Sequence, residues 1–277
     1  MDELVRDLPG SARVLDLGAG GGSFAYHSTQ AKVIAADLAF PPRAQSCWAR
    51  VIVRSQALAL KDATVDVAVC NHAFEHFEYL EETLFELNRV MKAGGYLWAA
   101  IPNGFCFDDD LYRFVFAGGG HVNRFSLQSF METVEANTQF RVLRYKKLYS
   151  GLVYLNPPSA DKLPAYPRRA RLLARVPPRL LESILRWANY LTRFSDRYLG
   201  SHMSHYGWGI IFRWETDPSP RRNLSALQIE RAPADLNVCF CCGAGHPEAT
   251  LKHRLHRFLF WKMYRCPTCG KENVFFG

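Results

Sequence analysis

Four cysteines near the C-terminus carry the strongest chemical signal in the sequence. Cys239 and Cys242 form one Cys-x-x-Cys pair, Cys266 and Cys269 form a second, and each pair is followed by a glycine. Two such pairs, separated by 23 residues, supply the four thiolates that zinc binds tetrahedrally. Four protein ligands leave no position for water, so we expect a structural Zn²⁺ that supports folding rather than a catalytic metal.

The other cysteines do not change this interpretation. Cys241 is an extra thiol inside the first pair, and Cys47, Cys70 and Cys106 are scattered through the first half of the chain. Crowding of five thiols into the last forty or so residues favours metal binding over disulfides. The alternative that a nearby histidine replaces one ligand stays open; the candidates are His246, His253 and His256.

A glycine-rich turn, Asp-Leu-Gly-Ala-Gly-Gly-Gly, runs from Asp16 to Gly22. Glycines let backbone amides approach a ligand closely, and the N-terminus of a helix expected after the turn would offer further N–H groups. The dinucleotide fingerprint requires glycine where this chain has Ser23, which disfavours nicotinamide and flavin cofactors. About twenty residues further on, Asp37 ends the next apolar run, where a carboxylate can accept both hydroxyls of an adenosine ribose.

Histidines in the segment NHAFEHF are candidate proton acceptors. His72 and His76 lie about one helical turn apart, with Glu75 between them, and His121 follows a run of three glycines. Histidine suits general-base chemistry because its pKa lies near the operating pH. We take His72 and His76 as catalytic candidates, and keep open the alternative that they only brace their loop.

The elements that must position these residues alternate between strand and helix. Short apolar runs predict buried parallel strands, and leucines at helical spacing predict a helix over residues 79–91. Two later aromatic runs predict an antiparallel pair, and a helix over residues 126–137 begins at the cap Ser126. A flexible loop is expected over residues 108–121. The predicted strands cover residues 13–17, 32–36, 50–54, 65–70, 96–101, 140–149 and 206–214. This alternation predicts an α/β fold, Rossmann-like, with a doubly wound, mostly parallel sheet.

Three segments complete the predicted organisation. Prolines interrupt a helical insertion over about residues 156–200, in which residues 180–198 form a basic amphipathic helix. A polar, proline-containing stretch over residues 217–236 is typical of a linker, and residues 237–277 form the zinc ribbon. Residues 1–216 then make up the catalytic domain that carries the insertion.

Several motifs, taken in order, resemble one known family. The segments VLDLGAGGG, VIAADLAF, LALKDATVDVAVCNHAFEHFEYLEETLFELNRVMKAGGYLWAAIPN and GHVNRFSLQSF are similar to the successive motifs of class I S-adenosylmethionine-dependent methyltransferases, in particular the methyltransferase type 11 family. The resemblance spans about residues 12–150. It implies S-adenosylmethionine as cofactor and a methyl transfer for which the enzyme mainly aligns the acceptor atom.

The resemblance also implies roles for individual residues. Asp16 would orient the glycine turn, and Asp37 would hold the ribose. The remaining cofactor contacts that it implies are Gly18, Gly20 and Gly22 at the methionine part, Gln56, Ala57 and Leu58 near adenine, and Asn71 and His72 at the border with the acceptor.

Charge is concentrated in the middle of the chain. The formal net charge is +8, and residues 144–231 hold 16 Lys/Arg against 6 Asp/Glu. The insertion is therefore interpreted in three ways: a lid over the acceptor, a surface for peripheral membrane contact, or an RNA-binding platform. We favour the lid, and with it an unidentified small-molecule, glycan or lipid-linked acceptor. An RNA methyltransferase and a non-catalytic adaptor of the same fold are the alternatives.

Location is predicted from what the sequence lacks. No run approaches the roughly 18 apolar residues of a membrane span, and the acidic start from Asp2 and Glu3 is unlike a secretory signal. We expect a cytoplasmic protein.

Overall fold

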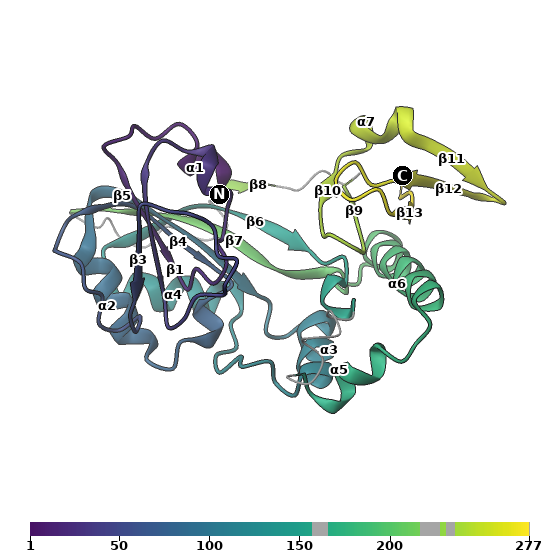
Figure 1. The fold of residues 1–277 in the computed structure, drawn as a ribbon, viewed down its shortest axis with the longest axis horizontal. Helices are drawn as coiled ribbons and strands as arrows, with labels where there is room; N and C mark the ends of the chain where they lie inside the picture. Colours follow the sequence, from purple (N-terminus) through teal and green to yellow (C-terminus); the bar gives the residue numbers. More distant parts are fainter. Residues whose placement is uncertain (157–165, 217–227, 231–235, 277) are drawn as a thin grey trace. The chain divides into compact units, whose positions relative to one another are not determined.

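The computed structural model describes residues 1–156, 166–216, 228–230 and 236–276 (Figure 1). The chain divides into two compact units, each built from separate stretches of sequence. The first unit comprises Met1–Pro102, Val122–Lys146 and Trp208–Glu230, and the second comprises Asn103–His121, Lys147–Gly207 and Arg231–Gly277. Within the described residues, no helix is long and apolar enough to cross a membrane.

An eight-stranded sheet has the order β3-β2-β1-β4-β5-β7-β6-β8. Its strands β1 to β5 pair in parallel, and β7 with β6 gives the predicted late antiparallel pair. The central strands are buried runs of valine, leucine, isoleucine and alanine, as expected of a parallel sheet. The bounds are β1 (Arg13–Leu17), β2 (Lys32–Asp37), β3 (Ala49–Ile52), β4 (Val65–Asn71), β5 (Met91–Pro102), β6 (Phe140–Tyr149), β7 (His205–Trp214) and β8 (Gln228–Glu230). The predicted Rossmann-like class is confirmed.

The register brings the sequence motifs to one edge of the sheet. Leu17 pairs with Ala36, so the glycine turn after β1 begins beside Asp37 at the end of β2. On the other side of β1, Asp16 pairs with Val69, which places the segment after β4 at the same edge. The carboxyl ends of the parallel strands therefore lie at this edge, which is where open α/β sheets bind ligands.

Helices α2 (Leu80–Val90) and α4 (Leu127–Asn137) pack in the first unit, where Leu84, Leu87 and Val90 of α2 are fully buried in the core. The predicted cap at Ser126 is confirmed, because its hydroxyl accepts from the Ser129 amide while the Ser129 hydroxyl bonds back to the Ser126 amide. The short α1 (Asp2–Val5) precedes the sheet.

The prediction of a helix after the glycine turn was wrong. Between β1 and β2 the chain forms only the 3₁₀ turn η1 (Tyr26–Ser28). Once the glycines end at Gly22, nine residues remain before Lys32, fewer than the roughly 11 of an average helix. Ser23, Ser28 and Thr29 also compete for backbone hydrogen bonds that a helix would need. The turn therefore leads into a loop instead of a helix N-terminus.

Before its C-terminal segment, the described part of the second unit contains the helices α3 (Phe107–Phe116), α5 (Arg168–Leu173) and α6 (Pro178–Tyr198), and the 3₁₀ turn η3 (Val153–Leu155). The prediction of a flexible loop over residues 108–121 is therefore wrong for residues 108–116, which belong to α3. The Cys106 sulfur caps the helix by accepting from the Asp109 amide at 3.4 Å, and Ala117 ends it in the left-handed region. α6 begins with the rigid Pro178 at its first position, as helices often do.

The C-terminal cysteine-containing segment belongs to the second unit and packs against α6. The Asn189 side-chain amide donates to the Val238 carbonyl at 2.8 Å, and Arg193 donates to the Leu236 carbonyl at 2.7 Å. Its elements are β9 (Asn237–Val238), β10 (Gly245–His246), α7 (Glu248–Leu251), η6 (Lys252–Arg254), β11 (Leu255–Phe258), β12 (Trp261–Arg265) and β13 (Glu272–Val274). Most of the linker predicted over residues 217–236 lies outside the described residues, apart from β8 and Leu236.

Candidate functional site

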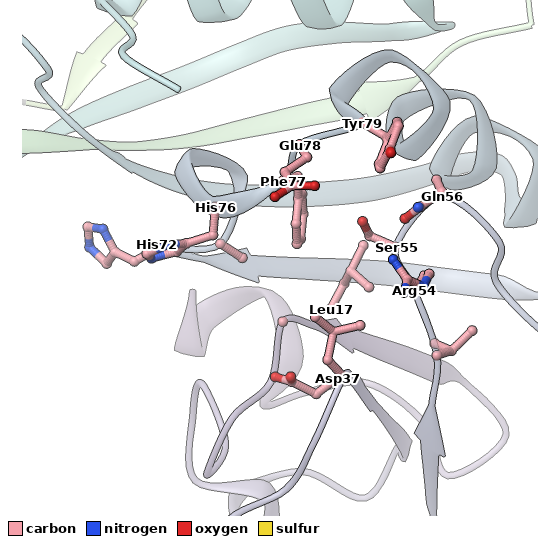
Figure 2. A pocket seen from close by; sticks show the side chains of 14 residues that line it. Leu17, Asp37, Arg54, Ser55, Gln56, His72, His76, Phe77, Glu78 and Tyr79 are labelled. Atoms are coloured by element: carbon pink, nitrogen blue, oxygen red, sulfur yellow. The ribbon is translucent and has the colours of Figure 1, made fainter. Parts of the chain in front are cut away.

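A pocket of about 400 Å³ opens at the carboxyl edge of the first unit's sheet (Figure 2). Asp37 lies on one side of it, opposite Phe77, Glu78 and Tyr79. The two histidines, His72 and His76, occupy one end, and Arg54, Ser55 and Gln56 occupy the other. The remaining lining residues are Leu17, Gly18, Leu38, Val53 and Ala73. This volume lies in the range of small-molecule and cofactor sites.

Asp37 joins the end of β2 to the glycine turn. Its Oδ2 accepts from the Gly20 amide at 2.7 Å, and its Oδ1 accepts from the Ala39 amide at 3.3 Å. A carboxylate has about four lone-pair sites, so these bonds leave acceptor capacity for hydroxyl groups in the pocket.

Gly18 needs to be glycine for two independent reasons. Its φ is +70°, in the left-handed region, and a Cβ there would lie 2.6 Å from the Cβ of Ala73. The turn therefore packs directly against the segment after β4, with the pocket beside it. Gly20 and Gly22 also have positive φ, +51° and +116°.

Asp16 lies beneath the turn and is fully buried. Its Oδ2 accepts from the Ser23 amide at 2.9 Å and from the Tyr26 hydroxyl at 2.6 Å, while Oδ1 accepts from the Ser23 hydroxyl at 2.6 Å. Burial raises the pKa of Asp16 above its ordinary value, and these hydrogen bonds oppose that rise. Asp16 thus holds the loop after the turn in place rather than facing the pocket.

The three residues expected near adenine are placed differently. Gln56 lines the pocket, whereas Ala57 and Leu58 are not among its lining residues. Leu58 is buried, and its amide donates to Glu86 of α2 at 2.7 Å. The segment after β3 is therefore tied to α2, which fixes where Gln56 enters the pocket.

The histidine segment folds as the 3₁₀ turn η2 (Phe74–His76). His72 adopts a φ of +54°, and its Nδ1 lies 3.5 Å from Oε1 of Glu75, which is almost fully buried. Among the described residues, Oε2 of Glu75 has no hydrogen-bond partner. The backbone carbonyl of Glu75 accepts from Val122 and Asn123, so the buried glutamate is held firmly beside His72. Asn71 ends β4 and is half-buried.

His121 belongs to the second unit. Its Nδ1 lies 3.1 Å from Oδ1 of the buried Asp109, and its ring stacks on Tyr112 with a centroid separation of 4.8 Å. These contacts brace the end of α3.

Sequence reasoning missed several pocket residues. Arg54 lies outside the quoted motifs, and Phe77, Glu78 and Tyr79 lie inside one of them without being predicted as pocket residues. Their only signal is position, because they follow β3 or η2 at the carboxyl edge of the sheet.

The four predicted cysteines gather in the second unit, with Sγ atoms of Cys239, Cys242, Cys266 and Cys269 all within 4.8 Å of one another. The Sγ atoms of Cys239 and Cys269 are 3.7 Å apart, and those of Cys242 and Cys266 are 3.6 Å apart. Zinc–sulfur bonds of about 2.3 Å in a tetrahedron require sulfur atoms about 3.8 Å apart. The donor set therefore fits a zinc ion.

Both cysteine pairs are shaped by the glycine that follows them. Gly243 and Gly270 have φ values of +72° and +75°, and their amides donate to the carbonyls of Cys239 and Cys266. His246 Nε2 lies 3.3 Å from the Cys266 sulfur. All eight cysteines, each within the described ranges, are free thiols, as the metal interpretation expects.

Comparison with known proteins agrees with this geometry. The strand order and the pocket at the carboxyl edge define a Rossmann-like, ligand-binding α/β protein. A family model described as a methyltransferase domain matches residues 1–145. That is more than half of the 277 residues, so the chain belongs to this family and is a class I S-adenosylmethionine-dependent methyltransferase.

Two solved structures illustrate the likeness of fold. One is a protein described as a methyltransferase from an antibiotic biosynthesis pathway of Anabaena variabilis, and the other is an S-adenosylmethionine-dependent methyltransferase from Archaeoglobus fulgidus. Each is 18% identical, with a TM-score of 0.51, over 76% of this chain. The matches cover 94% and 88% of those chains, respectively. A search among curated proteins found no match.

Proposed function

We propose that the pocket beside Asp37 binds S-adenosylmethionine and that the enzyme transfers its methyl group to a small-molecule, glycan or lipid-linked acceptor. The observation that carries the proposal is the position of Asp37, which faces the pocket while its backbone contacts leave lone pairs available. These would accept the two ribose hydroxyls. The methionine part would lie beside the turn that contains Gly18, Gly20 and Gly22, of which Gly18 lines the pocket, with Asp16 fixing the turn beneath them.

The far end of the pocket would receive the adenine ring. Gln56 offers an amide that can both donate and accept, and Tyr79 and Phe77 offer apolar surface. In this proposal Ala57 and Leu58 contribute through their backbone, since Leu58 anchors the segment to α2. Asn71 and His72 mark the border between cofactor and acceptor.

Charge in the pocket suits a cationic ligand. Its lining includes two carboxylates, of Asp37 and Glu78, and one guanidinium, of Arg54, so negative charge prevails and favours a positive charge on the ligand. When bound, S-adenosylmethionine supplies an electrophilic methyl group on a sulfonium that leaves readily.

His72 and His76 are the proposed proton acceptors for a hydroxyl or amine acceptor. Glu75 would act as a positioning residue, because its buried carboxylate lies 3.5 Å from Nδ1 of His72 and can hold the orientation of that ring. In many enzymes a neighbouring side chain orients the imidazole of a general base in the same way.

We also infer that the four cysteines hold Zn²⁺, since the sulfur separations and the free thiols fit a tetrahedral site. With four thiolates the ion would stabilise the fold of the second unit and take no part in methyl transfer. A cytoplasmic location, expected from the sequence, stays a prediction.

The decisive experiment is calorimetric titration of the purified, zinc-loaded protein with S-adenosylmethionine, with Asp37→Ala as the control. Micromolar binding that is lost in the variant would support the cofactor assignment. It would justify an acceptor screen with labelled methyl groups, starting with glycans, lipid-linked glycans and RNA. RNA methylation would favour the RNA methyltransferase alternative, and no binding by folded protein would favour the non-catalytic adaptor.

A further inference from the structure

The hairpin of β11 and β12 ends in three exposed apolar residues, Phe258, Leu259 and Phe260, which we call the hairpin tip. Their exposed fractions are 59%, 76% and 94%. Leu259 and Phe260 form the two-residue loop, since Phe258 pairs with Trp261 across the strands. Consecutive large apolar side chains in a loop of this kind contribute almost nothing to the protein's own core.

Two features of the hairpin are locally unfavourable. Leu259 has a φ of +53°, a conformation that two-residue hairpin loops normally give to glycine, asparagine or aspartate. Next to the loop, Arg257 lies directly opposite Lys262 in the register, and like charges opposite each other destabilise a strand pair. The hairpin's own folding explains neither choice. A negatively charged surface outside the protein would offset the repulsion between Arg257 and Lys262, and an apolar phase would bury the side chain that Leu259 exposes.

Positive charge prevails around the hairpin, where the acidic neighbour Glu272 of β13 lies 3.5 Å from Arg265. Residues 249–271 contain six Lys/Arg and no Asp/Glu. On the two strands, Arg257, Lys262 and Arg265 are exposed. Basic residues beside an apolar insertion element are attracted to anionic lipid headgroups.

Helix α6 extends this surface. Leu180, Ile184, Leu191 and Tyr198 recur on one face of the helix and are 50% to 59% exposed; we call them the helix stripe. Trp261 packs the hairpin against the same helix, because its ring lies 4.9 Å from that of Trp187 and 5.2 Å from that of Tyr190 on α6. Figure 1 shows the hairpin projecting from the ribbon past α6 within the second unit.

We propose that the hairpin tip and the helix stripe dock on the surface of an anionic lipid bilayer, with the tip inserted at the boundary between headgroups and acyl chains. Aliphatic side chains dominate the stripe, and leucine and isoleucine cannot stack on bases as the aromatic platforms of RNA-binding proteins do. The apolar content therefore favours lipid over RNA. The proposal does not depend on cofactor binding in the first unit.

The test is sedimentation of the full-length, zinc-loaded protein with vesicles of phosphatidylcholine, alone or mixed with phosphatidylserine. We expect binding to the mixed vesicles that weakens as salt rises. Phe260→Ala should weaken binding about tenfold or more, whereas Phe85→Ala, which truncates an exposed phenylalanine on α2, should leave it unchanged. Arg257→Gln and Lys262→Gln should each weaken it by about fivefold.

The double variant Leu259→Gly with Phe260→Asn guards against misfolding. It places glycine at the left-handed position, so the hairpin should form at least as well as before while losing its apolar tip. Loss of vesicle binding with retained zinc content supports the proposal. Wild-type binding by this variant, or no binding by the wild type, overturns it. So does a tip-dependent gel shift with RNA, or tip-dependent dimerisation, in the absence of vesicle binding.

Discussion

The Gly20 amide donates to the Asp37 carboxylate over 2.7 Å, which ties the glycine turn after β1 to the end of β2. The same carboxylate is the proposed ribose acceptor, so one side chain shapes the turn and faces the ligand. Asp37→Asn keeps an oxygen for Gly20, whereas Asp37→Ala removes it. We expect both to weaken S-adenosylmethionine binding, by about tenfold or more since a charged hydrogen bond contributes about 1.5–3 kcal/mol. Alanine should be the worse of the two in calorimetric titration, and equal affinities would contradict the double role.

Steric fit at Gly18 can be separated from backbone strain. Gly18→Ala places a methyl group 2.6 Å from the Ala73 Cβ, whereas Gly94→Ala, at a φ of +77°, meets nothing within 4 Å. Both variants carry the left-handed penalty of about 1–2 kcal/mol. Only Gly18→Ala should also lose S-adenosylmethionine binding, because the segment after β4 must shift. Unchanged affinity in Gly18→Ala would show that this packing does not set the pocket.

Tyr26→Phe should destabilise the first unit by about 1.5–3 kcal/mol, since it leaves the buried Asp16 carboxylate without one hydrogen bond. Urea unfolding measures the change in free energy. Tyr198→Phe removes a hydroxyl from a side chain that is 59% exposed and should change little. Equal effects of the two variants would mean that the Asp16 network contributes no stability.

The proposed zinc ligands can be tested by substituting the adjacent residues Cys241 and Cys242 one at a time. Cys242→Ser removes a proposed ligand, whereas Cys241→Ser removes the thiol beside it that lies outside the four-sulfur cluster. We expect elemental analysis to find a single zinc ion per chain in the wild type and in Cys241→Ser, and strongly reduced zinc in Cys242→Ser. Chelation should raise protease sensitivity around β9 to β13. Full zinc occupancy in Cys242→Ser would rule out the proposed ligand set.

His205 should make stability depend on pH. Burial lowers its pKa from 6.5 to about 4, so the unfolded chain binds this proton more readily than the folded protein. Above pH 6.5 the imidazole is neutral in both states and does not affect stability. As pH falls toward about 4, protonation of the unfolded chain lowers the free energy of unfolding, by at most about 3 kcal/mol. His205→Gln should flatten the pH dependence of unfolding in this window. Parallel curves for wild type and His205→Gln would refute the assignment.

The strands were predictable because each is a short, nearly continuous apolar run bounded by turn residues. The helix α2 and the Ser126 cap were predictable from leucine spacing and hydroxyl chemistry. The missing helix after the glycine turn was not, since the prediction followed the usual strand-turn-helix unit and overlooked how few residues separate Gly22 from Lys32. Helix α3 was missed because its three consecutive aspartates, Asp108 to Asp110, suggest a polar loop, although two of them are buried.

Within the candidate site, the sequence indicated Asp37, Gln56 and the histidines, all of which line the pocket. It could not indicate Glu78 or Arg54, since their proximity depends on how η2 and the segment after β3 pack. The resemblance implied that Asp16 orients the turn, and the structure adds the contacts, which are three hydrogen bonds from Ser23 and Tyr26 to a buried carboxylate.

The division of each unit among separate chain segments bears on how the protein is made. Pro102, the last residue of β5, is translated 106 residues before Trp208, where the first unit's last stretch begins. At about 5–20 residues per second, the ribosome would take roughly 5 to 20 seconds to synthesise the chain from the end of β5 to β7. During that interval β5 presents an unpaired apolar edge, so nascent chains should depend on chaperones, and a truncation before residue 208 should aggregate rather than yield a smaller enzyme.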